Sequence, residues 1–272
     1  MKKLSLFVAL ILITVVAASS ANAACTKATL TAKDNWGMLL QGLDASGQVT
    51  ATLVVFGTDG KGTIGNVAST VVGHGYTIDA ITGPANVVSV AGSYTVIPGT
   101  FGPLAPCQGT LSLSLNGGAP QAFHFQLNNA NKTGYLQEDG IAVSGYLAKG
   151  ANAATAPCSL SSAGMVAQHS TGGSGFAFGG VGQAAFESLT GYDGLGNITG
   201  GVTNSQIGPF TVIGNTILGA YTVAADCTGT IAVSLSPSGL GYLGNTFTYN
   251  SGKNGFLLFT NPPATVTGLI TN

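Results

Sequence analysis

Two halves of this chain carry the same short motifs in the same order. Three motifs recur: DGKGTI at 59–64 returns as DGLGNI at 193–198, YTV at 94–96 as YTV at 221–223, and CQGTL at 107–111 as CTGTI at 227–231. Colinear matches at a nearly constant spacing indicate an internal duplication. The chain is therefore expected to fold as two copies of one unit, which limits its architecture more than any single residue does.

The N-terminus has the composition of an export signal. Two lysines follow Met1, a mainly apolar run covers 4–18, and small residues stand at Ala21 and Ala23. This order predicts a signal peptide over 1–23 and a periplasmic or extracellular location in a bacterium. The apolar run is shorter than the roughly 20 residues that a helical span needs, so no stable membrane span is expected. Attachment of a lipid to Cys25 is the alternative.

The composition argues against strongly charged partners. Charged residues make up 6% of the chain, against about 25% in an average globular protein, and the formal net charge is −1. The chain contains no arginine. Nucleic-acid binding relies on clustered Lys and Arg that neutralise phosphates, so no nucleic acid is expected as a partner. The surface is expected to be wetted by Ser, Thr, Asn and Gln.

The four cysteines fall two to a copy: Cys25 and Cys107 in the first, Cys158 and Cys227 in the second. Four cysteines allow three pairings, and duplication favours a bridge within each copy, Cys25–Cys107 and Cys158–Cys227. They lack the Cys-x-x-Cys spacing of a zinc or redox site, and an exported chain meets an oxidising environment. We expect all four to be structural.

Apolar and polar residues alternate along much of the chain with the period of a half-buried strand. TLSLSL at 110–115 alternates strictly, Asn116-Gly117-Gly118 turns the chain, and AFHFQL at 122–127 alternates again. Eight strands are predicted in each copy, near 37–43, 50–57, 63–73, 92–97, 109–115, 121–127, 134–138 and 141–148, and near 163–169, 182–190, 197–203, 219–224, 229–235, 245–250, 255–260 and 265–270.

The predicted fold is all-β: two tandem antiparallel up-and-down eight-stranded barrels. Closing each sheet into a barrel removes exposed strand edges, which are a hazard for a chain rich in Val, Thr and Ile. The predicted organisation is a signal peptide over 1–23, a first barrel over 24–150, a linker over 151–157 and a second barrel over 158–272. The linker is short, so the two barrels are expected to sit close together.

The repeated Asp-Gly-x-Gly sequence is predicted to be a hairpin turn. Its residues are Asp59, Gly60 and Gly62 in the first copy and Asp193, Gly194 and Gly196 in the second. Glycine accepts the positive φ that such turns require. One carboxylate per turn falls far short of the six to eight oxygen ligands that Ca²⁺ takes, so a turn is favoured over an ion site.

The order of these motifs resembles a group of uncharacterised bacterial secreted proteins. The likeness rests on the Asp-Gly-x-Gly turn, on Gly-x-Tyr-Thr-Val and on the sequence DCTGT at 226–230. Those proteins are thought to form a small calycin-like barrel, similar in outline to lipocalins or allene oxide cyclase. The resemblance implies a fold but no activity. The first copy departs from it with a longer segment at 98–106 and with Gln108 in place of Thr228.

No catalytic or metal-binding constellation stands out, and no cofactor is expected. His124 lies between Phe123 and Phe125, so on a strand it points to the opposite, polar face and is expected at the surface. Glu138 and Asp139 are adjacent carboxylates at the end of a predicted strand. Because strand neighbours point apart, a shared acid–base site is not expected, and both are predicted to be solvated.

Six aromatic residues are the candidate ligand-binding residues, because they are expected to share the inward face of their barrels: Tyr94, Phe123, Phe125, Tyr221, Phe247 and Tyr249. In this alignment of the copies, Phe123 and Phe125 correspond to Phe247 and Tyr249. An eight-stranded barrel can also be filled by its own side chains, so core packing is the competing interpretation.

The leading functional hypothesis is a secreted or periplasmic protein that binds a small hydrophobic ligand in a barrel cavity. The alternative is a non-catalytic structural or cell-surface interaction protein with filled barrels. A sixteen-stranded outer-membrane barrel and a barrel-fold isomerase are less favoured. Enzymatic activity stays open because a fold alone assigns none. The sequence does not identify an oligomeric state.

Overall fold

The computed structural model describes the strands and most of the turns between them: residues 25–26, 29–30, 35–43, 49–65, 74–79, 86–97, 107–128, 132–150, 158, 163–174, 182–207, 210–225, 227–249, 254–259 and 264–271. The predicted signal peptide over 1–23 and the predicted linker over 151–157 lie outside these residues.

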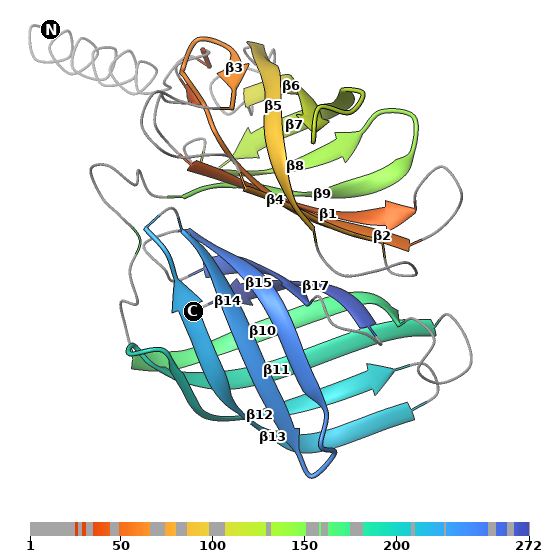
Figure 1. The fold of residues 1–272 in the computed structure, drawn as a ribbon, viewed down its shortest axis with the longest axis vertical. Helices are drawn as coiled ribbons and strands as arrows, with labels where there is room; N and C mark the ends of the chain where they lie inside the picture. The colour runs from red at the N-terminus through yellow and green to blue at the C-terminus, as the bar shows by residue number, and fades with distance from the viewer. Residues whose placement is uncertain are drawn as a thin grey trace, which may run out of the picture.

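The first copy forms a ring of antiparallel strands, called barrel 1 below (Figure 1). Its strands are β1 (Asn35–Leu43), β2 (Val49–Gly57), β3 (Thr63–Ile64), β4 (His74–Asp79), β5 (Asn86–Ile97), β6 (Cys107–Leu115), β7 (Gln121–Asn128), β8 (Thr133–Glu138) and β9 (Ala142–Lys149). The sheet order is β3-β5-β4-β2-β1-β9-β8-β7-β6, and β6 also pairs with β5. The pairing of β5 with β6 closes the ring, and the short β3 lies beside β5.

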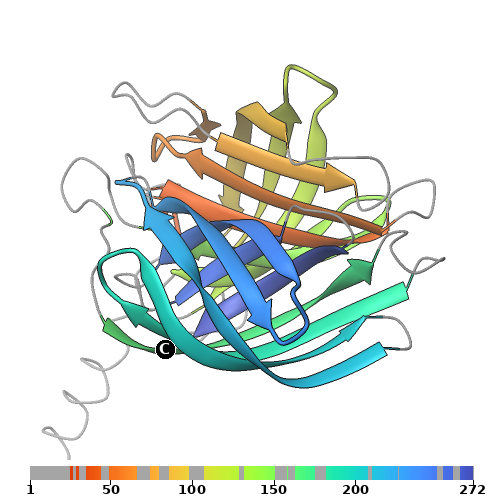
Figure 2. The same ribbon diagram turned by 60° about the horizontal axis from the view of Figure 1, so that its bottom comes forward.

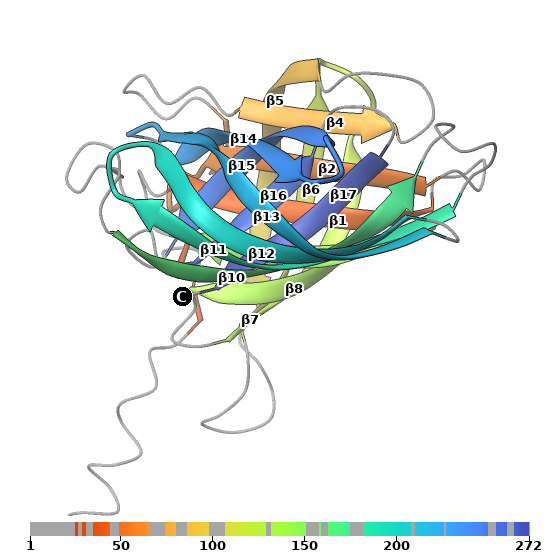
Figure 3. The same ribbon diagram turned by 90° about the horizontal axis from the view of Figure 1, so that it is seen from below.

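The second copy forms a closed barrel, called barrel 2, in which each strand pairs with the next along the chain (Figures 2 and 3). Its strands are β10 (Ala163–Ser174), β11 (Gly182–Asp193), β12 (Asn197–Ile207), β13 (Phe210–Val223), β14 (Thr228–Ser236), β15 (Gly241–Tyr249), β16 (Asn254–Phe259) and β17 (Ala264–Thr271). Pairing of β17 with β10 completes the ring.

The predicted all-β fold of two antiparallel barrels is confirmed, with one difference in the first copy. The strand predicted at 63–73 covers only β3 at Thr63–Ile64 in the described residues, and β4 at His74–Asp79 was not predicted. In barrel 2 the single strand β12 occupies the place that β3 and β4 share in barrel 1. The alternative of one sixteen-stranded barrel is wrong, because the two copies close separately.

Large apolar side chains fill the interior of barrel 1. The fully buried ones include Trp36, Phe56, Tyr94, Phe123 and Phe125. These five come from four strands, β1, β2, β5 and β7. Burial alternates along β6 and β7, whose inward residues are buried and whose outward residues are not. Burying an aromatic side chain of this size removes 150–250 Å² from water by typical values, so this cluster dominates the stability of barrel 1.

Each copy contains one disulfide bridge. Cys25 is bonded to Cys107 and Cys158 to Cys227, which are the two bridges that duplication favours. Because the sulfur of Cys25 is in a bridge, it is not available for lipid attachment. The first bridge holds the N-terminal segment against barrel 1, where Leu30 is fully buried and its carbonyl accepts hydrogen bonds from the hydroxyls of Tyr94 and Thr58.

The Asp-Gly-x-Gly sequences form the predicted turns. A carboxylate oxygen of Asp59 accepts hydrogen bonds from the backbone N–H groups of Lys61, Gly62 and Thr63 at 2.7–2.9 Å. Desolvation opposes ionisation of Asp59, but these N–H donors outweigh it and lower its pKa to about 2. Gly60 and Gly62 have φ of 72° and 123°, which glycine tolerates. Asp193 accepts equivalent bonds from Leu195 and Asn197.

The two barrels pack against each other through an apolar interface. On the barrel 1 side it consists of the outward side chains of β1 and β2, and on the barrel 2 side of those of β15 and β16: Leu39, Ala51, Leu53 and Val55 face Phe247, Phe256 and Leu258. The inward residues of the same strands belong to the two interiors. These four strands are thus buried on both faces, and the barrels form one body.

Candidate functional site

The six candidate aromatics do not share one environment. Tyr94, Phe123 and Phe125 lie in the interior of barrel 1, and Tyr221 packs against the interior cluster of barrel 2. The ring of Tyr221 meets that of Tyr192 edge-on, with 4.8 Å between centroids. For these four residues the predicted inward orientation is correct.

The predicted inward orientation of Phe247 and Tyr249 is wrong, because both lie in the interface between the barrels. Leu111 pairs with Phe123 across β6 and β7, but Ile231, the counterpart of Leu111, pairs with Gly244. Gly244 therefore replaces Phe123, and Phe247 replaces Gln126. The assumed match was three positions off, and an odd shift moves a strand side chain to the opposite face.

The interior of barrel 1 retains a small void near one end. Its volume is about 100 Å³, and its lining includes Met38, Val54, Leu113 and Phe123 together with the carboxyl group of Glu138. Glu138 is 9% exposed, so the prediction that it is solvated is wrong. Burial and the neighbouring charge of Asp139 raise the pKa of Glu138 above its ordinary value.

Asp139 points outward, as expected for the strand neighbour of an inward residue. Its carboxylate lies 3.1 Å from the Nε2 atom of His124, and both side chains are more than half exposed. The surface position predicted for His124 is therefore confirmed. Within the described residues, no group of three or more His, Cys, Asp or Glu side chains is placed to hold a metal ion.

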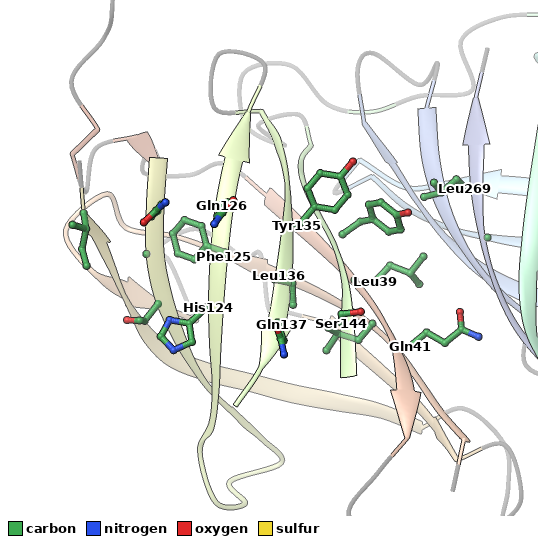
Figure 4. A pocket seen from close by; sticks show the side chains of 18 residues that line it. Leu39, Gln41, His124, Phe125, Gln126, Tyr135, Leu136, Gln137, Ser144 and Leu269 are labelled. Carbon is green, nitrogen blue, oxygen red and sulfur yellow. The ribbon is translucent and has the colours of Figure 1, made fainter. Parts of the chain in front are cut away.

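A hollow lies outside the barrels, on the outer face of β6–β9 and β1, and is called the outer groove below (Figure 4). Its volume is about 890 Å³, and β17 of barrel 2 contributes to its wall. It is lined by Leu39, Leu40, Gln41, Ile97, Gln108, Gly109, Thr110, His124, Phe125, Gln126, Tyr135, Leu136, Gln137, Ser144, Gly145, Tyr146, Gly268 and Leu269. No Lys, Arg, Asp or Glu is among them.

Cross-strand pairing arranges the floor of the outer groove in two rows. Gln108, Gln126, Tyr135, Tyr146 and Leu39 are successive partners from β6 to β1. The second row runs beside it and consists of Thr110, His124, Gln137, Ser144 and Gln41. The first row combines amide and aromatic groups, and the second is polar throughout.

An aromatic row links the outer groove to the interface. The ring of Tyr135 lies 5.3 Å from that of Tyr146, Tyr146 lies 6.4 Å from Phe256, and Phe256 lies 6.3 Å from Phe247. Exposure falls along this row from 60% at Tyr135 to zero at Phe247. Burial and the nearby phenol of Tyr146 raise the pKa of Tyr249, whose ring lies 5.2 Å from that of Phe256 and is tilted against it.

The outer groove is the counterpart of the face by which barrel 2 contacts barrel 1. Glu138 pairs with Phe123, and Phe259 pairs with Gly244, the counterpart of Phe123, so Phe259 takes the position of Glu138 in barrel 2. By the same count along the strand, Phe256 corresponds to Tyr135 and Leu258 to Gln137. The same register places Phe247 at Gln126 and Leu269 at Tyr146. One face of the ancestral unit is thus apolar and buried in the second copy but polar, aromatic and open in the first.

The fold and the outer groove define a tandem antiparallel β-barrel protein with a neutral surface site. Comparison of the chain with known protein families, curated proteins and solved structures finds no match. Among the residues described, no helix has the length and apolar character needed to cross a membrane.

Sequence reasoning did not find the outer groove or the interface. The interface has a signal, since LVVF at 53–56 and FLLF at 256–259 are continuous apolar runs, which are typical of strands buried on both faces. The outer groove has a weaker signal in the sequence. Tyr135 and Tyr146 take the polar, outward positions of their strands, where large aromatics call for an explanation.

Proposed function

We propose that this is an exported, non-catalytic interaction protein with calycin-like barrels, which contacts its partner through the outer groove. The single observation that carries the proposal is the location of the space. The void inside barrel 1 is about 100 Å³, whereas the groove outside it is about 890 Å³. Ligand pockets typically measure about 300–1,000 Å³, a range that includes the groove and not the void.

The packing of barrel 1 supports the filled-barrel alternative over a hydrophobic guest. Trp36, Tyr94, Phe123 and Phe125 occupy the interior with at most 2% of their surface exposed. A guest of ten or more carbon atoms requires these side chains to move, which costs free energy in an interior packed as densely as an organic crystal.

The two disulfide bridges support an oxidising location, periplasmic or extracellular. A rigid body suits this environment. Its barrels have no free strand edge in the described pairings and its copies are joined by an apolar interface, so a surface site is held in a fixed shape.

The test uses Trp36, the one tryptophan of the chain, which is fully buried inside barrel 1. A doxyl-labelled stearate that enters the barrel quenches tryptophan fluorescence. We expect no saturable quenching of the wild-type protein. Saturable quenching at micromolar stearate contradicts the proposal and supports a hydrophobic ligand.

A variant with an enlarged interior provides the matched control. Leu113 lines the void and is fully buried, so Leu113→Ala adds to a cavity that already exists. Apolar cavities of about 150 Å³ bind benzene-sized guests. Benzene should stabilise Leu113→Ala against heat and leave the wild type unchanged.

A further inference from the structure

We propose that the outer groove binds a neutral oligosaccharide. This inference rests on the proposed function and names the chemical class of the ligand. The first reason is electrostatic. The lining has neither Lys, Arg, Asp nor Glu, and the Nε2 atom of its one histidine, His124, lies 3.1 Å from the carboxylate of Asp139. A charged ligand entering such a site loses hydration without gaining an ion pair, so the groove favours an uncharged one.

The second reason is the combination of aromatic and amide groups. A sugar ring has apolar C–H faces and hydroxyl edges. Tyr135 and Tyr146 are direct cross-strand partners with ring centroids 5.3 Å apart and planes tilted by 50°. They offer two adjoining aromatic faces, each of which can pack against a C–H face of a sugar ring. Gln126 and Gln137 flank Tyr135 on β7 and β8, and each amide can donate to one hydroxyl and accept from another.

The exposure of the two tyrosines is the third reason. Among the described residues, Tyr135 and Tyr146 are the aromatic side chains that are exposed, and both lie in the outer groove. Of their counterparts, Phe256 is buried in the interface with barrel 1 and Leu269 is partly buried there. Aromatic area has therefore been kept on this face of the first copy although Tyr135 is left 60% exposed and no described residue covers it.

The comparison with barrel 2 argues against a protein partner. Where that face binds protein permanently, it has Phe247 and Leu258. At the same positions the groove has Gln126 and Gln137, which suit a hydrated ligand rather than a dry interface. Addition of a peptide strand is not open to this face either, because β6–β9 and β1 are each paired on both sides.

Isothermal titration calorimetry of the protein with both barrels present tests the proposal. The neutral probes are cellohexaose, maltohexaose, xylohexaose and mannohexaose, and the acidic probe is hexagalacturonic acid. We expect at least one neutral probe to bind and the acidic one to bind at least about tenfold more weakly. Tyr135→Ala should lower the affinity about tenfold, as truncation of an aromatic hot spot typically does. Tyr135→Phe keeps the ring and should bind like the wild type.

Leu243→Ala is the matched control, since Leu243 is 56% exposed on barrel 2, and it should leave the affinity unchanged. Failure of all four neutral probes to bind overturns the proposal, as does equal binding by Tyr135→Ala. Binding of decaproline in place of the sugars also overturns it, but leaves an interaction protein standing. Quenching of Trp36 by doxyl-stearate instead contradicts the proposed function itself, so the two failures are distinguishable.

Discussion

Gly37 should tolerate no side chain, because the ring of Phe247 occupies the space. A Cβ atom at Gly37 would lie 2.1, 2.4 and 2.7 Å from the Cδ1, Cε1 and Cγ atoms of Phe247. Carbon atoms in contact are about 3.5–4.0 Å apart, so the ring would have to withdraw by more than about 1 Å. Phe247 is fully buried, with Gly150 also against it and Phe256 stacked on it, so it has little room to move.

We therefore expect Gly37→Ala to lower the free energy of unfolding by about 1–3 kcal/mol, the usual cost of overpacking. For a chain of this size this corresponds to a fall in Tm of roughly 2–12 °C. Urea denaturation and differential scanning calorimetry measure it. Gly241→Ala is the matched control, because its nearest atom, the carbonyl oxygen of Val233, is 3.7 Å away. Both Gly→Ala substitutions restrict the unfolded chain and so stabilise the folded state by a similar amount, which the control therefore cancels.

A double-mutant cycle separates the clash from other effects. Phe247→Ala alone should cost about 3–5 kcal/mol, the range for a buried aromatic. In that background Gly37→Ala should cost little, since the ring is gone, which gives an interaction energy of about 1–3 kcal/mol. Strictly additive effects, or a Gly37→Ala variant as stable as Gly241→Ala, would refute the docking of Phe247 on β1.

Three further changes test other parts of the structure. The raised pKa of Glu138 means that its ionisation opposes folding at pH values above the unfolded pKa of about 4.3. Glu138→Gln should therefore leave the free energy of unfolding unchanged below about pH 4 and raise it at pH 8. Urea titrations at both pH values measure this. The lowered pKa of Asp59 means that its ionised form stabilises the folded protein, and this stabilisation is lost as pH falls from about 4 through about 2. Asp59→Asn lacks this contribution, so its Tm should fall less than that of the wild type over the same pH range. A Tm that falls equally in both proteins contradicts this. Glu187 of β11 stands in barrel 2 where Leu53 of β2 stands in barrel 1. Combining Gln126→Phe and Gln137→Leu with Glu187→Leu should therefore recreate both faces of the interface and make the protein self-associate in sedimentation velocity, because each added Leu side chain contributes about 1.5–3 kcal/mol when buried. A protein that stays at its wild-type sedimentation coefficient at high concentration argues against equivalent faces.

Features that depend on local geometry could be predicted from the sequence. The Asp59 turn needs one carboxylate and two glycines within a few residues, and the bridges follow from placing Cys107 and Cys227 at the same point of each copy. The orientation of Phe247 could not be predicted in this way. It depends on the length of the hairpin between β14 and β15, which differs by one residue from that between β6 and β7. The outer groove depends on pairing across five strands, and only the register places Tyr135 beside Tyr146.

The duplication also explains why the two copies differ at their surfaces. The interface is heterologous: β15 and β16 of the second copy pack on β1 and β2 of the first. Two identical copies joined in this way would leave both kinds of face open at the ends, and such contacts between molecules generate rings or filaments. Here the open faces are polar at several matching positions, although Leu189 of β11, which is half exposed, stands where barrel 1 has Val55. Leu39 and His169 are counterparts, since they pair with the counterparts Tyr146 and Leu269. Their other partners, Leu53 of β2 and Glu187 of β11, therefore occupy the same position in the two barrels. On the opposite face, Gln126 of barrel 1 stands where barrel 2 has Phe247. Polar replacement opposes stacking of further molecules on either end. Tyr135 departs from this trend, since it keeps an aromatic ring where solubility alone favours a polar side chain, and a ligand for the outer groove accounts for it.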